Sequence, residues 1–389
     1  MNVLINRSDA IGDTILTLPL AQLIKEIYPN SKVYFLLQKN NEALLLHNPF
    51  VDKILVYNRN ESLLIRFKKL INTFKALSID HYLYVGGDNL PSLLAFFYRV
   101  KFRGGLRKKL NHFLFLNKGV WQRRSRVKMH EGMYNIKLLE SIGTPIPSKM
   151  IAKISLPLKL CRVEVEKGAE KLKSMLEVEV KKRGFNLATE YIVIHPGMKG
   201  SALNWPSEFY LQLISYIEQK IPSRFNYIIS FTTSDLPYVV PIRKLLESGN
   251  TSENTNENGK IKDKIFFLNG EDVGTRGYMA ILSNSKLFIG PSTGTTHMAN
   301  ALGVDLVAIY SPVKVQSFKR WGPFFNSKIG TNNSSGKVKV LVPLVNCQSH
   351  FKCDPECIHK GNCMSLLKVE SVGQQVLIML KEQGNFSKV

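Results

Sequence analysis

The sequence lacks any apolar run of about 20 residues, the length that a membrane-spanning helix requires. It lacks an early strand followed by G-x-G-x-x-G, and it shows no helix-turn-helix, RNA-recognition or zinc-finger pattern. The first residues, MNVLINRSDAIGD, contain only a four-residue apolar stretch, which is too short for a secretory signal peptide. These absences disfavour a membrane-spanning protein and a Rossmann dehydrogenase, and they predict a cytoplasmic location.

Acidic residues are also scarce. The chain has 53 Lys and Arg against 30 Asp and Glu, a net charge of +23. Between Arg99 and Lys128 there are eleven basic residues and no acidic one, with aromatic residues interleaved. Such a run is either a solvated basic face or a docking surface for an anionic partner, and we expect the latter. The predicted docking residues are Lys101, Arg103, Arg107, Arg123, Arg124 and Arg126.

Cysteine is rare as well, with five residues in the chain. Cys161 is alone, and the other four, Cys347, Cys353, Cys357 and Cys363, are separated by five, three and five residues. Zinc-ribbon ligands usually stand about two to four residues apart. We therefore predict reduced thiols and no metal, with a structural metal that also uses His350 and His359 as the alternative.

What the sequence does contain is a repeated alternation of strand and helix patterns. In the first half, apolar strand patterns lie at 3–5, 31–38, 53–58 and 81–87, and a helical pattern at 14–28 is interrupted by Pro19. In the second half, strand patterns lie at 191–197, 226–231, 264–270, 286–292 and 306–312. Helical patterns lie at 163–184, 206–219 and 365–383. This order predicts an α/β protein of two domains with parallel sheets.

We place one domain at 1–160, a second at 161–345 and a closing Cys-containing segment at 346–389. Polar stretches at 249–263 and 326–337 are predicted to be surface loops. Ligands of parallel sheets bind beyond the carboxyl ends of the strands, so the loops that leave the strands are the candidate site.

The stretch IGPSTGTTHMANALG (289–303) passes from a strand pattern to a helix pattern. Backbone N–H groups at a helix start, together with small hydroxyl residues, suit a phosphate or diphosphate. The candidate residues are Ser292, Thr293, Gly294, Thr295, Thr296 and His297. Ordinary helix capping by Ser or Thr is the alternative. A second polar loop after a strand supplies His195, Lys199 and Ser201.

In the first half, Gly12 and Asp13 stand at a predicted helix start. An Asp carboxylate is ionised at neutral pH and can accept a proton from a hydroxyl, so Asp13 is the candidate general base. Helix capping by Asp13 is one alternative, and Asp9 is a competing base in the same loop.

These segments together resemble the ADP-heptose:lipopolysaccharide heptosyltransferases of glycosyltransferase family 9. The resemblance rests on R-S-D-A-I-G-D-T-I-L-T-L-P, then H-P-G and N-W-P, then G-P-S-T-G-T-T-H-M-A-N-A-L-G. It implies a GT-B fold, two Rossmann-like domains whose parallel sheets face a central cleft. The domain at 1–160 would then bind the acceptor, and the domain at 161–345 the nucleotide sugar. It also implies that Asp13 is the base and that Thr293, Gly294 and His297 hold the diphosphate.

The chain departs from the family at three places. Ser292 stands where many members have Asp, and Leu203 where many have Lys or Arg, so Lys199 is the expected cation. Ser234 or Asp235 is the nearest match to the acidic residue that contacts the donor.

The resemblance further implies inverting, metal-independent transfer of a heptose or related sugar from an ADP-sugar to a lipopolysaccharide core acceptor, without a cofactor. The expected partners are an acidic, phosphorylated, lipid-linked glycan and the anionic inner membrane, with which the protein would be peripherally associated. A transferase for another nucleotide hexose is one alternative. A basic nucleic-acid-binding protein, suggested by the charge, is the other.

Overall fold

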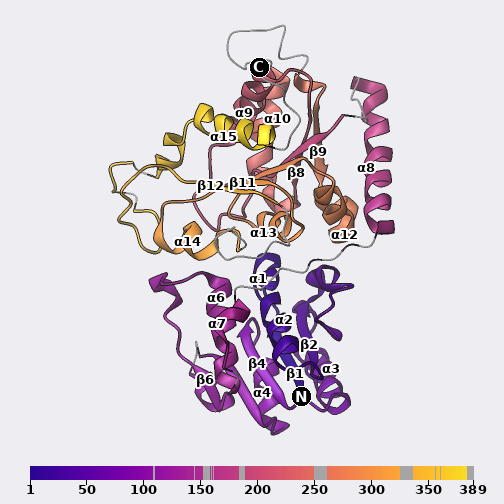
Figure 1. Cartoon of the computed structure of the whole chain (residues 1–389), viewed down its shortest axis with the longest axis vertical. Coiled ribbons are helices and arrows are strands. Elements are labelled where there is room, and N and C mark those ends of the chain that lie inside the picture. Colours follow the sequence, from indigo (N-terminus) through magenta and orange to yellow (C-terminus); the bar gives the residue numbers. More distant parts are fainter. Residues whose placement is uncertain are drawn as a thin grey trace. The chain divides into compact units, whose positions relative to one another are not determined.

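The structure is a computed structural model of the chain (Figure 1). It describes residues 1–107, 110–143, 145–151, 158, 160, 162–183, 189–248, 261–324, 336–354, 356–359 and 361–382. Cys161 and most of the two predicted polar loops, 249–260 and 326–335, lie outside these residues. The contacts divide the chain into two compact units. Unit 1 takes Met1–Lys159 and Phe324, and unit 2 takes Leu160–Pro323 and the described residues after 335.

Unit 1 is built on a six-stranded parallel sheet with the strand order β3-β2-β1-β4-β5-β6. The strands are β1 (Asn2–Arg7), β2 (Lys32–Gln38), β3 (Lys53–Tyr57), β4 (His81–Gly86), β5 (Phe102–Leu106) and β6 (Lys118–Val120). The middle strands are buried on both faces, and Val3, Leu4 and Ile5 are wholly inaccessible. Continuous apolar runs of this kind are what a sheet covered on both sides requires.

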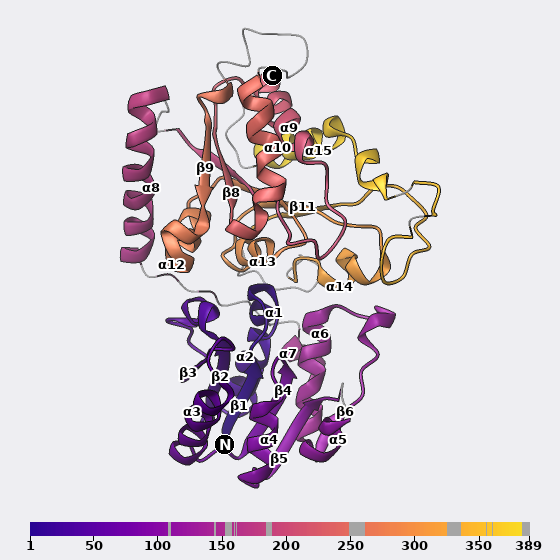
Figure 2. The ribbon, with the colours of Figure 1, turned by 180° about the vertical axis from the view of Figure 1, so that it is seen from behind.

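Helices flank this sheet (Figure 2). They are α1 (Ile11–Ile15), α2 (Leu18–Ile27), α3 (Leu63–Ala76), α4 (Leu90–Phe97), α5 (Asn111–Phe115), α6 (Glu131–Ile136) and α7 (Ser148–Ile151). The predicted break at Pro19 is confirmed, because α1 ends at Ile15 and α2 carries Pro19 in its first turn, where a missing N–H costs nothing. Short 3-10 segments occur at Lys39–Leu45, Arg124–Arg126 and Lys137–Ile142.

Unit 2 is also built on a six-stranded parallel sheet, with the strand order β12-β11-β10-β7-β8-β9. The strands are β7 (Tyr191–Ile194), β8 (Asn226–Phe231), β9 (Ile265–Asn269), β10 (Leu287–Pro291), β11 (Leu306–Ile309) and β12 (Val338–Leu341). The helices are α8 (Arg162–Arg183), α9 (Ser207–Lys220), α10 (Leu236–Ser248), α12 (Gly270–Ser283), α13 (Gly294–Ala301), α14 (Phe318–Trp321) and α15 (Val369–Leu380).

The C-terminal helix belongs to the core of unit 2. Val372 and Val376 of α15 are fully buried in the same cluster as Ile214 and Ile217 of α9. The indole of Trp205, which is itself buried, donates to the carbonyl oxygen of Leu367 just before α15 (2.9 Å). The segment that the sequence separates as 346–389 therefore completes unit 2, as far as it is described.

Candidate active site

In each sheet the order in which the chain adds strands reverses once, and this position is called the switch point. Ligands of open parallel sheets bind there, beyond the carboxyl ends of the strands. In unit 1 the chain lays down β1, β2 and β3 in one direction, then places β4 on the other side of β1. In unit 2 it lays down β7, β8 and β9, then places β10 on the other side of β7. The loops at 6–13, 195–205 and 290–297, which carry the candidate residues, leave β1, β7 and β10 at these two switch points.

A buried arginine occupies the switch point of unit 1. Arg7, the last residue of β1, is 4% exposed. Its Nη1 donates to the carbonyl oxygen of Val85 in β4 (3.0 Å), its Nη2 forms a short ion pair with Asp13, and its Nε lies 3.5 Å from Asp9 Oδ2. Burial, the largest influence, opposes the charge, but Asp13 and Asp9 outweigh it and the pKa of Arg7 is raised.

Asp13 lies in the first turn of α1 and is not its N-cap, a position that Ala10 holds. Arg7 engages Oδ1 of Asp13, and no hydrogen bond from a described residue engages Oδ2. Asp9 differs, because Arg7 faces one of its oxygens and Arg59 Nη2 lies 3.2 Å from the other. Of the two carboxylates, Asp13 therefore keeps an oxygen free to accept a proton.

Two glycines make room for this arrangement. At Gly86, the last residue of β4, an added Cβ would lie 2.5 Å from Asp9 Oδ2 and 2.6 Å from Arg7 Nη1. At Gly87, whose φ is +101°, an added Cβ would lie 2.3 Å from Ser8 Oγ. Any side chain at Gly86 would displace the ion pairs of Arg7. The two glycines at the end of the strand pattern YVGG are therefore a sequence signal of this site, and our prediction did not include them.

In unit 2 the predicted phosphate-binding turn lies where β10 ends and α13 begins. Thr293 is the N-cap of α13, but its side chain makes no capping hydrogen bond. Side-chain capping, the alternative that the sequence leaves open, is therefore absent at this described helix start. The first N–H groups of α13 have no partner within the helix, which suits an anionic ligand.

The hydroxyl groups of the turn divide into two kinds. Thr296 Oγ1 is buried and donates to the carbonyl oxygen of Pro291 (2.5 Å), and Ser292 hydrogen-bonds the hydroxyl of Tyr310, so both hold the turn together. Thr295 Oγ1 is buried without a hydrogen-bond partner among the described residues. Gly294 begins the helix, and the imidazole of His297 is buried beneath it. Thr295 is therefore the hydroxyl that a ligand would satisfy.

His195 lies behind this turn, at the end of β7. It is 2% exposed, its Nδ1 lies 3.1 Å from Ser230 Oγ and its Nε2 lies 3.6 Å from Asp235 Oδ2. Burial lowers its pKa to about 4, against the opposing effect of Asp235. Ser230 in turn bonds the hydroxyl of Tyr278 (2.8 Å). Direct ligand contact, as predicted for His195, does not fit this burial, because both ring nitrogens face protein groups.

The loop after His195 carries an exposed cation. Lys199 has a left-handed backbone (φ +54°), which costs about 1 kcal/mol for a residue other than glycine. Its neighbours fix it there, since Gly200 N donates to Tyr238 Oη (3.1 Å) and Ser201 Oγ donates to the carbonyl oxygen of Met198 (2.9 Å). The Ser201 hydroxyl thus shapes the loop, and Lys199 is the group that the loop displays.

The basic segment of unit 1 contains structural as well as exposed cations. Arg124 is 5% exposed, pairs with Glu131 (2.5 Å) and donates to Asn135 Oδ1 (2.9 Å). The prediction that Arg124 is a docking residue is therefore wrong: it is a buried, paired charge.

Two other predicted docking residues are partly engaged, because Arg103 donates to Val100 and Phe115 carbonyls and Arg107 donates to that of Leu116. Lys101, Arg123 and Arg126 are exposed.

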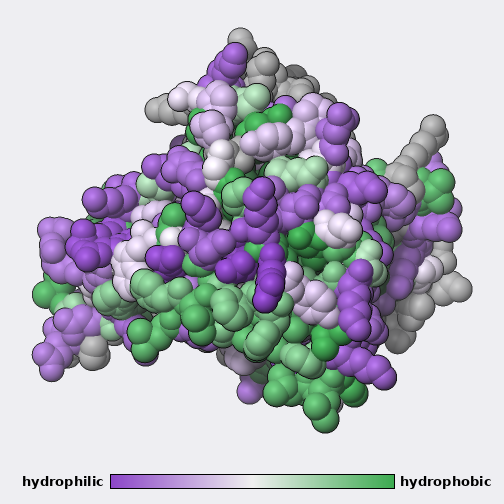
Figure 3. All heavy atoms as spheres, turned by 90° about the horizontal axis from the view of Figure 1, so that it is seen from below, coloured by the Kyte–Doolittle hydropathy of each residue, from purple (hydrophilic) through white to green (hydrophobic). Residues whose placement is uncertain are grey.

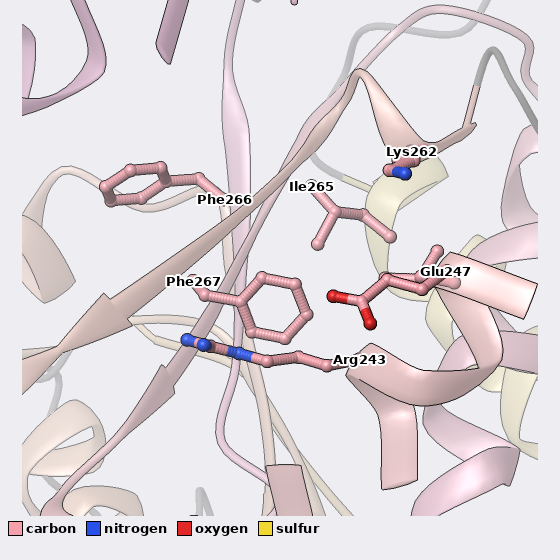
Figure 4. A pocket seen from close by; sticks show the side chains of 7 residues that line it. Arg243, Glu247, Lys262, Ile265, Phe266 and Phe267 are labelled. Carbon is pink, nitrogen blue, oxygen red and sulfur yellow. The ribbon is translucent and has the colours of Figure 1, made fainter. Parts of the chain in front are cut away.

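Two described cavities lie elsewhere. A cavity of about 240 Å³ lies between α10 and the amino-terminal half of β9, with Arg243, Glu247, Phe266 and Phe267 among its lining (Figure 4). The ends of strands that carry the candidate residues are not part of it. A cavity of about 140 Å³ in unit 1 lies between β3 and α3, lined in part by Arg66 and Lys69.

Cys347, Cys353 and Cys363 form no disulfide, and within the part of the chain that the structure describes no group of three or more His, Cys, Asp and Glu side chains is arranged to hold a metal. Among the described helices, none is long and apolar enough to cross a bilayer.

Comparison with known proteins finds a family similarity in a segment of unit 2 that includes the turn. Residues 275–341 match the family described as glycosyltransferase family 9 (heptosyltransferase). This stretch of the chain is therefore similar to family 9 glycosyltransferases. The matched residues run from α12 through β10, α13 and β11 to β12, and they include the uncapped helix start.

A Haemophilus influenzae relative named "Putative glycosyltransferase" is 24% identical over 325 residues, which cover 82% of this chain and 85% of the relative. Two solved structures share the fold along nearly their whole lengths. Escherichia coli ADP-heptose lipopolysaccharide heptosyltransferase II is 17% identical with a TM-score of 0.71, covering 98% of this chain and 99% of that one. A family 9 glycosyl transferase from Veillonella parvula is 16% identical with a TM-score of 0.70, covering 98% and 97%. These structures confirm the predicted GT-B fold. The family match and the named relative confirm the predicted enzyme class, a glycosyltransferase.

Proposed function

We propose that this glycosyltransferase moves a heptose, or a related sugar, from an ADP-sugar to a lipopolysaccharide core acceptor, with inversion at the anomeric carbon and without a metal. The observation that carries the proposal is the uncapped start of α13, with the unpartnered hydroxyl of Thr295 beside it. Donor choice is supported by a third structure of similar fold, described as E. coli heptosyltransferase WaaC with ADP (15% identical, TM-score 0.64, covering 97% of this chain and 100% of that one).

The donor diphosphate binds at the switch point of unit 2. Its oxygens accept hydrogen bonds from the first N–H groups of α13 and from Thr295, and the ammonium of Lys199 pairs with it. As the bond between the anomeric carbon and the diphosphate oxygen breaks, its electron pair remains on the diphosphate. The same donors then stabilise the added charge, which is the role that a metal ion has in other transferases.

The acceptor hydroxyl binds at the switch point of unit 1. Its oxygen forms the new bond to the anomeric carbon from the face opposite the leaving diphosphate, and its proton passes to Asp13 Oδ2. Arg7 holds Oδ1 of the same carboxylate, so the accepting oxygen faces the substrate. The exposed cations Lys101, Arg123 and Arg126 lie in the same unit and suit an acidic, phosphorylated, lipid-linked glycan.

The decisive test separates transfer from donor binding. In Asp13→Asn we expect transfer to fall by about a thousandfold, the range for loss of a general base, with the Kd of ADP unchanged. Calorimetry measures ADP binding, and a discontinuous assay of released ADP measures transfer. Undiminished transfer in the variant would remove Asp13 from the role of base.

The same calorimeter tests the base of the nucleotide, since a transferase for another hexose would bind UDP or GDP more tightly than ADP. That result would keep the enzyme class and replace the donor.

A further inference from the structure

The exposed apolar side chains of unit 1 are concentrated on one helical layer. Of the thirteen large apolar residues that unit 1 exposes among those described, ten belong to α3, α4, α5 and the end of β6. They are Leu63, Leu64, Ile65, Phe67, Phe97, Tyr98, Leu110, Phe113, Leu114 and Trp121. An exposed apolar group of this size on a soluble fold marks an interaction surface more often than chance placement.

The elements that carry these residues form a continuous layer. Helix α3 packs against α4, and α4 packs against α5. Phe74 of α3 stacks on Tyr98 at the end of α4 (5.6 Å between ring centroids), and Phe113 of α5 lies 6.4 Å from Trp121. From below, unit 1 shows a broad green band of apolar side chains beside purple hydrophilic ones (Figure 3).

The charge on this layer has one sign. Residues 62–130 contain fifteen Lys and Arg and only two acidic residues, Asp80 and Asp88. Asp88 is paired with Arg66 (3.0 Å), and Asp80 accepts a hydrogen bond from the backbone N–H of Asn2 (2.9 Å). Exposed cations, by contrast, accompany the apolar residues along the layer: Lys68, Lys75, Arg99, Lys101, Lys118 and Arg123.

Proteins that bind the surface of an anionic bilayer present this combination of apolar and basic side chains. Leu and Phe side chains enter the boundary between headgroups and acyl chains, Trp prefers the headgroup level, and Lys and Arg extend toward lipid phosphates. Arg107 shows this pairing of basic and apolar groups locally, since its guanidinium lies 5.0 Å from the ring centroid of Phe113.

We propose that the α3–α4–α5 layer of unit 1, with Trp121, is a membrane-docking surface that inserts apolar side chains into an anionic bilayer. This deepens the proposed function, because it assigns the lipid-linked acceptor's membrane to a particular surface. This proposal differs from purely electrostatic docking by the basic run 99–128. Inserted apolar side chains should keep the protein on the bilayer when salt screens the charges.

The test uses the full chain and vesicles of phosphatidylglycerol and phosphatidylethanolamine, without donor or acceptor. The test variant is Leu64→Ser, Leu110→Ser, Leu114→Ser and Trp121→Ser combined. We expect its partition coefficient in vesicle sedimentation to fall at least tenfold at 150 mM salt. A matched control in unit 2 combines Leu344→Ser, Phe351→Ser, Ile358→Ser and Val163→Ser, which are similarly exposed, and should bind like the wild type.

Trp121 provides a second measurement. The chain has three tryptophans, and Trp205 is 1% exposed. Tryptophan emission of the wild type should shift to the blue on anionic vesicles, and Trp121→Phe should abolish that shift while retaining binding.

An equal loss of binding in the unit 2 control, or no blue shift, would overturn the proposal. A dimer in light scattering that the unit 1 variant alone dissociates would assign the surface to a second copy of the chain instead. Transfer to a soluble acceptor should be unchanged in the unit 1 variant, so failure of lipid binding and failure of the proposed chemistry are separable.

Discussion

The two switch points of the molecule have the same topology and opposite electrostatics. In unit 1, the ends of β1 and β4 gather formal charges: Arg7 stands between Asp9 and Asp13. In unit 2, the turn after β10 carries neutral donors, and the carboxylate of Asp235 is buried beside His195. In the mechanism that we propose, the first site takes up a proton and the second receives negative charge.

This difference explains why the two halves are not interchangeable. A carboxylate facing the turn of unit 2 would repel a diphosphate, and a row of neutral hydroxyls in unit 1 would have no group able to hold a proton. Burying charged side chains in the folded state costs free energy, because they lose their contacts with water. In unit 1 the ion pairs with Arg7 offset this cost for the partly buried carboxylates of Asp9 and Asp13. The following substitutions test the comparison, beginning with the one expected to have the largest effect after Asp13→Asn itself.

Replacing Arg7 should affect catalysis more than it affects fold. In Arg7→Met we expect kcat/KM to fall about a hundredfold, about 2.7 kcal/mol, because Asp13 loses the group that orients it. The fall should be mainly in kcat, with KM little changed, because the acceptor can still bind while the carboxylate that takes its proton is no longer oriented.

The control for this prediction is Arg59→Met, which removes the cation that faces Asp9 but not Asp13. It should leave kcat nearly unchanged, and Arg7→Lys should restore part of the activity. An unchanged kcat per folded molecule in Arg7→Met would show that Arg7 only supports the fold.

In unit 2 the corresponding group is His195, and its effect should be on stability. Burial lowers its folded-state pKa to about 4, below the value of about 6.5 in an unfolded chain. Between these pH values the unfolded chain binds a proton that the folded chain does not. The contribution of His195 to the free energy of unfolding should therefore be fully present above pH 6.5 and fall by about 3 kcal/mol toward pH 4.

Urea unfolding at pH 7.0 and pH 4.5 measures this dependence. His195→Gln should flatten it, whereas His359→Gln, a histidine outside the network, should not. An identical pH dependence in His195→Gln and the wild type would mean that other groups cause the acid sensitivity.

The sequence predicts those parts of the two sites that are local in the chain. Strand-then-polar-loop patterns locate Asp13 and the turn at 292–297 because each lies within a few residues of the strand that presents it. The role of Arg7 is not local, since its partner Val85 stands 78 residues away on β4, and strand order decides that they meet. The sequence does not predict strands β5 and β6, because FRGGL and KGV are short, rich in glycine and lack a run of apolar residues.

The error at Arg124 has a similar origin. Within the run 99–128 it is one cation among eleven, and nothing in the run distinguishes it. Its partners Glu131 and Asn135 lie just beyond the run, seven and eleven residues away. Local charge density therefore predicted a basic surface, but the packing of α6 determines which arginine it buries.

The smallest predicted effect distinguishes two hydroxyls of the unit 2 turn. Thr295→Val removes a hydroxyl that has no partner among the described residues, so stability should be unchanged or slightly increased, since an unsatisfied buried group costs free energy. If the hydroxyl serves the diphosphate, the Kd of ADP should rise about tenfold, about 1.4 kcal/mol.

Thr296→Val is the matched control, because its hydroxyl is already bonded to the carbonyl oxygen of Pro291. It should lower the free energy of unfolding by about 1 kcal/mol and leave the Kd of ADP nearly unchanged. Calorimetry with ADP and urea unfolding of both variants give the two quantities. The reverse pattern, with Thr296→Val weakening ADP and Thr295→Val not, would mean that the turn holds its ligand through its shape and that Thr295 is only a buried side chain.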